Sequence, residues 1–196
     1  PGNYHHISID RNHDKYMRRF FPEIVRGPYL PLAGTELYPN KSSVPVTCRR
    51  YDVMMVGNYC VPQTFERFIT RIDDEYTAFY YGMIDDLFAN PHKTVEEVAE
   101  AHLRDELGEV PEEELKKTMA ALTFIDLYVR YTLRGRIVQE LVDAGIKVHV
   151  FGDGWDRLPC RHEENLILMN NLDSAGCLKK LCHAKISLNV MPWFKD

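Results

Sequence analysis

Residues 152–155, Gly-Asp-Gly-Trp, directly follow the apolar and β-branched run at 146–151. Glycine permits the positive φ of a tight turn and lets a ligand or another backbone segment come close. The pattern therefore predicts a buried strand that ends in a binding loop. Trp155 has two roles open to it, stacking on a ligand or packing the loop. Asp153 either contacts a ligand or stabilises the turn by bonding its own backbone.

A second loop of this kind, Gly57-Asn58-Tyr59, follows the strand pattern that starts at Tyr51. In open α/β sheets, ligands bind beyond the carboxyl ends of the strands, so we expect both loops to border one crevice. No G-x-G-x-x-G motif follows the first strand, which disfavours a bound NAD or FAD.

Two arginines, Arg130 and Arg134, lie four residues apart on a predicted helix that leads to the second strand. This spacing places both guanidinium groups on one helix face. Each guanidinium offers a planar fork of donors, so the pair suits a phosphate. The alternative is salt bridging to acidic residues elsewhere in the chain.

The elements around these residues predict an α/β fold with a Rossmann-like parallel sheet. A helical pattern closes at Gly145 before the second strand, and Asp173 or Ser174 is the expected N-cap of a later helix. This alternation of strands and helices builds a parallel sheet. The strands are expected at 51–57, 146–151, 166–169 and 185–190.

About ninety residues separate the first strand from the second, whereas a crossover needs about a dozen. A helical insertion at about 63–122 accounts for the excess. Its apolar spacing predicts one long amphipathic helix from Thr64 to Leu87. A second helix begins at the capping box that Thr94 and Glu97 form, and a third follows.

The insertion is strongly acidic: residues 73–114 contain fourteen Asp or Glu and two Lys or Arg. Such a run is usually a solvated face, and docking of a protein partner is the alternative. The whole chain of 196 residues carries a formal net charge of −5, which argues against a nucleic-acid surface.

Composition and spacing also bear on location, disulfides and metals. No apolar run is long enough for a membrane span and no signal-peptide pattern opens the chain, so we expect a cytoplasmic protein. Five irregularly spaced cysteines do not suggest a disulfide framework. His5, His6 and His13 lack acidic or cysteine partners at a recognised metal-ligand spacing, so no bound metal is expected.

The order of these motifs resembles a known family. The chain is similar to the bacterial, spore-coat CgeB-like glycosyltransferases in the order of four segments. These are Val56-Gly57-Asn58-Tyr59, then Arg130-x-x-x-Arg134, then residues 148–155, and then the segment from Leu178 through Leu188-Asn189-Val190. Members of this family are GT-B enzymes with two Rossmann-like domains. The resemblance covers most of the chain except the helical insertion.

The resemblance implies transfer of a sugar from a nucleotide-sugar donor to an acceptor. It implies no cofactor and no required metal, because basic side chains and a helix amino terminus hold the diphosphate. Residues 152–155 would lie near the nucleoside, and the residues after the first strand would face the diphosphate and sugar. The expected substrate-binding residues are Asn58, Tyr59, Arg130, Arg134, Gly152, Asp153, Gly154, Trp155, Met191 and Pro192.

The resemblance also implies a domain division. Residues 1–27 would end an amino-terminal, acceptor-side domain, 28–50 would link the domains, and 51–196 would form an incomplete donor-binding domain. The chain is then a piece of a longer glycosyltransferase and inactive alone. The alternative is a non-catalytic α/β scaffold whose acidic insertion binds a protein partner; fold alone does not choose between them.

Overall fold

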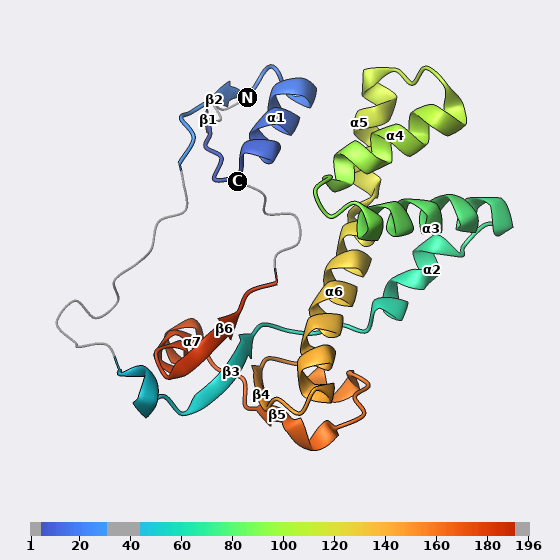
Figure 1. Cartoon of the computed structure of the whole chain (residues 1–196). Helices are drawn as coiled ribbons and strands as arrows, with labels where there is room; N and C mark the ends of the chain where they lie inside the picture. The colour runs from blue at the N-terminus through green and yellow to red at the C-terminus, as the bar shows by residue number, and fades with distance from the viewer. Residues whose placement is uncertain (1–4, 31–43, 191–196) are drawn as a thin grey trace. The chain divides into compact units, whose positions relative to one another are not determined.

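The computed structural model describes residues 5–30 and 44–190 (Figure 1). Among these, residues 5–30 and 68–126 form one compact unit, which we call the helical unit. Residues 44–67 and 127–190 form a second, the sheet unit. One helix, α6 (Thr123–Asp143), begins in the helical unit and continues into the sheet unit.

The sheet unit confirms the predicted α/β, Rossmann-like architecture. Its four strands, β3 (Tyr51–Val56), β4 (Val148–Phe151), β5 (Leu166–Met169) and β6 (Ala184–Leu188), are all parallel. Their order is β5-β4-β3-β6. The chain therefore starts at an internal strand, adds β4 and β5 on one side, and returns to place β6 on the other. The strand order reverses between β3 and β6, which makes this the topological switch point.

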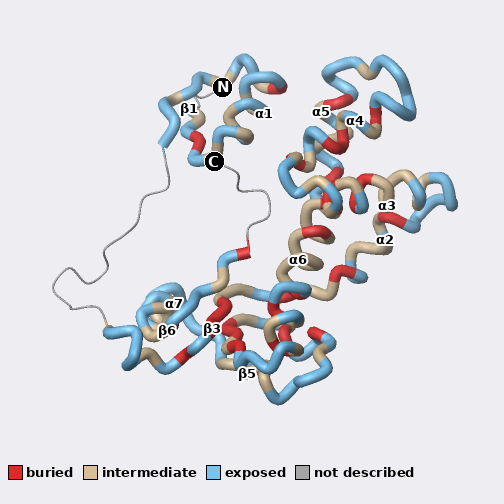
Figure 2. Tube along the Cα trace, viewed as in Figure 1, coloured by how far each residue is buried: buried red, intermediate tan, exposed pale blue. Residues whose placement is uncertain are grey.

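Each face of the sheet packs against a helix, because successive side chains of a strand point to opposite faces. On one face, Val53 and Val150 pack with Val138 and Val142 of α6. The other face carries Met54 and Phe151, with Leu181 of α7 (Ser174–Leu181) packed against them. Buried residues gather along β3 and the adjoining part of α6 (Figure 2).

In the helical unit, α1 packs against the insertion helices. Phe20, Leu103 and Leu115 form one buried cluster. At the same contact, Nη1 of Arg19 lies 2.5 Å from Oε2 of Glu100. The elements of this unit are β1 (His5–His6), α1 (Arg11–Phe20), β2 (Val25–Arg26), α3 (Asp74–Ala89), α4 (Val95–Leu107) and α5 (Glu112–Ala121).

The prediction of one long helix from Thr64 to Leu87 is wrong. The segment starts within the 3-10 helix Pro62–Phe65, continues through the short helix α2 (Glu66–Ile69) and then enters α3. Asp73 explains the interruption, because its carboxylate accepts a hydrogen bond from the Tyr76 amide at 2.8 Å and so caps a new helix.

Other predicted helix boundaries agree with the structure. The capping box of Thr94 and Glu97 is present at the start of α4, and Asp173 caps α7. Gly145, two residues after the end of α6, adopts a φ of 84°. Of the expected linker at 28–50, residues 31–43 lie outside the described part, and the division into acceptor-side and donor domains stays a prediction.

No helix of the described residues combines the length and the apolar character that a membrane crossing requires.

Candidate functional site

The loops that follow β3 and β4 touch each other backbone to backbone. A Cβ added to Gly152 would lie 2.4 Å from the carbonyl oxygen of Gly57, and one added to Gly154 would lie 2.1 Å from that of Tyr59. Both glycines also have positive φ, 141° and 85°. Only glycine fits at such positions, because any side chain would force the two loops apart.

Hydrogen bonds extend the pairing of these strands into the loops. The Tyr59 amide donates to the Asp153 carbonyl at 2.9 Å, and the Asp153 amide donates to Oδ1 of Asn58 at 3.0 Å. Asn58 is exposed, and its Nδ2 group makes no hydrogen bond to the described residues. The Asn58 side chain therefore fixes the neighbouring loop through its oxygen and keeps a donor for a ligand.

Trp155 and Tyr59 are buried beneath the loops rather than exposed at their surface. Trp155 is 1% exposed, and its Nε1 donates to the Gly57 carbonyl at 2.7 Å. The Tyr59 ring stacks on it with the centroids 5.2 Å apart, and burial raises the pKa of Tyr59. Trp155 thus packs the loop, one of its two expected roles. The Tyr59 ring packs beneath the loop, and its expected contact with a diphosphate or sugar stays a prediction.

Arg134 brings a positive charge to this edge of the sheet. Its Nη1 donates to the Asn58 carbonyl at 2.7 Å, and its guanidinium lies over the Tyr131 ring, 5.4 Å from the centroid. Burial, and then the neighbouring charge of Arg130, lower the pKa of Arg134. Within the described residues no carboxylate forms an ion pair with Arg134. A fixed, partly desolvated guanidinium beside a second one favours an anion.

Asn171 belongs to this site, although sequence reasoning missed it. Its Nδ2 donates to Oδ1 of Asp153 at 2.5 Å, so the Asp153 carboxylate bonds across to the segment after β5. Asn189 follows β6 and is exposed. For Asn171 a signal was available, since it is a polar residue two positions beyond the predicted strand at 166–169, whereas Asn189 fell inside the predicted strand at 185–190.

The structure therefore brings most of the expected site residues to one edge of the sheet. Asn58, Arg134 and residues 152–155 share the hydrogen bonds and contacts described above. Arg130 lies one turn before Arg134 on α6, partly buried. Met191 and Pro192 lie outside the described residues.

The described part of the chain has no group of three His, Cys, Asp or Glu side chains that could hold a metal ion. Polar contacts at this edge come from amides, the Asp153 carboxylate and the Arg134 guanidinium.

Comparison of the chain with protein-family models, with curated proteins and with solved structures finds no match. The family resemblance therefore has no support beyond the motifs that carry it.

Proposed function

We propose that the carboxyl edge of the sheet unit binds the diphosphate of a nucleotide-sugar, and that the chain is part of a GT-B-type glycosyltransferase. The observation that carries this proposal is Arg134, fixed against the Asn58 carbonyl at the end of β3. β3 borders the switch point with β6, where open parallel sheets bind their ligands. Asn58 and Asn189 flank that point from the two strands.

The position of α6 supports recognition by side chains rather than by a helix amino terminus. Many Rossmann-like domains bind phosphate with the free amides that open the helix after the first strand. Here the first α-helix after β3 is the four-residue α2. The helix that packs on the sheet, α6, begins at Thr123, eleven residues before Arg134, a distance of about 16 Å along the helix. The amides near Arg134 are therefore inside the helix and already bonded. Guanidinium groups from Arg130 and Arg134 supply the positive charge in their place.

These residues would act on the leaving group of the reaction. In glycosyl transfer, the oxygen of an acceptor hydroxyl forms a bond to the anomeric carbon and gives up its proton to a base, while the bond to the nucleoside diphosphate breaks. Negative charge then grows on the departing diphosphate, and Arg134 and Arg130 would stabilise it. The Nδ2 group of Asn58 would donate to the diphosphate or the sugar. The absence of a metal requirement and a cytoplasmic location stay predictions of the same proposal.

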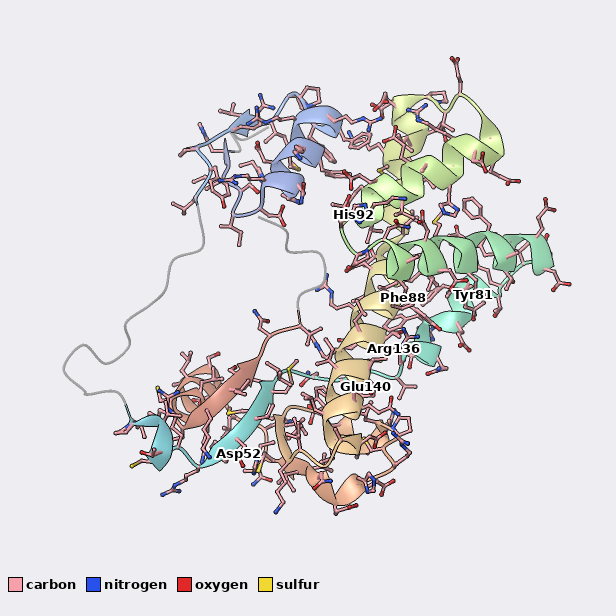
Figure 3. All side chains as sticks on the ribbon, in the orientation of Figure 1. Asp52, Tyr81, Phe88, His92, Arg136 and Glu140 are labelled. Carbon is pink, nitrogen blue, oxygen red and sulfur yellow. The ribbon has the colours of Figure 1, made fainter. Side chains whose placement is uncertain are left out.

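Calorimetric titration with UDP, GDP, dTDP and their sugars tests this proposal. One of the nucleotides should bind the chain, and Arg134→Gln should weaken it roughly tenfold or more, because hydrogen bonds from charged donors are the strong ones. Arg136→Gln is the matched control, since Arg136 is an exposed arginine of the same helix (Figure 3). The proposal fails if no nucleotide binds, or if the two variants lose affinity equally.

A further inference from the structure

The helical unit carries a groove between α3 and α4, with a volume of about 390 Å³. Its apolar lining comes from Ala78 and Phe79 of α3 and from Leu103 and Leu107 of α4, and its carboxylates are Glu75 and Glu106.

The apolar lining includes a side chain that the fold leaves in water. Leu107 is 65% exposed, whereas Leu103, one turn earlier on the same face of α4, is 6% exposed. Leu103 belongs to the core of the helical unit and Leu107 continues its face outward. An apolar side chain placed in the groove would cover Leu107 and remove that surface from water.

The two carboxylates of the groove come from opposite helices and have no ionic partner among the described residues. Glu75 lies on α3 and Glu106 on α4, and both are exposed. By contrast, Glu100 of the same helix is paired with Arg19. The groove thus presents unneutralised negative charge from both of the helices that form it.

We infer that this groove binds a cationic amphipathic helix of a partner protein, with its apolar side chains on the groove floor and its Lys or Arg side chains at the two carboxylates. An amphipathic helix in an apolar groove is a common mode of peptide recognition. The negative charge of the helical unit favours a positively charged partner, because residues 73–114 carry fourteen acidic and two basic side chains. This surface repels nucleic acids and anionic membranes and attracts a basic segment.

The test uses the whole chain and a fluorescent synthetic helix with leucine on one face and lysine on the other. We expect saturable binding by fluorescence anisotropy. A scrambled peptide of the same composition should bind more weakly, because its leucines no longer share a face. Replacing the lysines with glutamates should abolish binding. Equal binding of the scrambled peptide would overturn the inference, as would binding of the acidic one.

Two double variants distinguish binding at the groove carboxylates from attraction to the overall negative charge of the helical unit. Glu75→Gln with Glu106→Gln should weaken the lysine peptide about fivefold, since two exposed ion pairs are lost. Glu109→Gln with Glu113→Gln removes the same charge from exposed positions outside the groove and should change affinity less than twofold. Equal losses in the two variants would show a diffuse electrostatic effect and overturn the inference.

A third variant tests the apolar part of the groove. Leu107→Ala should also weaken binding several-fold, and the high exposure of Leu107 means that the fold tolerates the change. Unchanged far-ultraviolet circular dichroism checks this. Unchanged affinity of the folded Leu107→Ala variant would contradict the placement of the peptide.

Discussion

Gly154→Ala tests whether the close approach of two loops holds the carboxyl edge of the sheet together. Gly154 has a φ of 85°, and an added Cβ would lie 2.1 Å from the Tyr59 carbonyl oxygen. Gly145 has nearly the same φ, 84°, but nothing lies within 4 Å of its added Cβ. Both glycines belong to the sheet unit, so the two variants separate backbone strain from close approach.

The expected costs differ because only one variant breaks contacts. Gly145→Ala places an L side chain at positive φ, which costs about 1 kcal/mol. Gly154→Ala has this same cost and also forces the Tyr59 carbonyl to move. This movement strains the bonds from the Tyr59 amide to Asp153 and from the Asp153 amide to Asn58, each contributing about 1 kcal/mol. The Gly154 variant should therefore lose about 3 kcal/mol of unfolding free energy.

Urea unfolding followed by circular dichroism measures both variants. The midpoint for Gly154→Ala should fall well below that for Gly145→Ala at a similar slope. If the two variants lose the same stability, strain alone accounts for Gly154, and the argument that the loops require contact at this position is refuted. A nucleotide titration of the Gly154 variant should show weakened binding as well, because Asn58 and Arg134 share the displaced loop.

Two further predictions concern the helical unit. Hydrogen bonds from Arg19 lower the pKa of Glu100 from its ordinary 4.5 to about 2. This stabilisation is full above about pH 4.5 and is lost as the pH falls toward about 2. Arg19→Gln should make urea stability less dependent on pH in that window, and an unchanged pH dependence would contradict the assignment. Thr94→Ala removes the capping box of α4 and should cost about 1 kcal/mol in thermal unfolding, whereas Thr94→Ser should cost little; equal losses would argue against the cap.

Local signals were enough to predict most elements of the fold. The capping box at Thr94 and the cap at Asp173 are short-range hydrogen-bond patterns whose partners lie within three residues. Glycine or polar residues interrupt the apolar runs near the ends of the strands. These interruptions were enough to predict the sheet and the polar residues at its carboxyl edge. The break before α3 was missed because the apolar spacing continues across residues 70–73, while the carboxylate of Asp73 caps a new helix.

The site was harder to predict, because residue type does not say which way a side chain faces. Tyr59 and Trp155 stack on each other and pack in the sheet core. They are ninety-six positions apart in the chain, so only the tertiary packing determines that both side chains face inward. The partner of Asp153 is Asn171, eighteen residues later, which only the adjacency of β4 and β5 reveals. Long-range pairings of this kind depend on the tertiary structure and leave no local pattern in the sequence.

The interval between β3 and β4 also bears on how the chain folds. Val53 pairs with Val148, so β3 can pair with β4 only after the ribosome has added 95 further residues. Pairings of high contact order form slowly, whereas neighbouring helices such as α3 and α4 meet early. During synthesis, β3 must therefore remain an unpaired apolar segment while the insertion folds. Such a segment is prone to aggregation, and slower translation or lower temperature would favour recovery of folded protein.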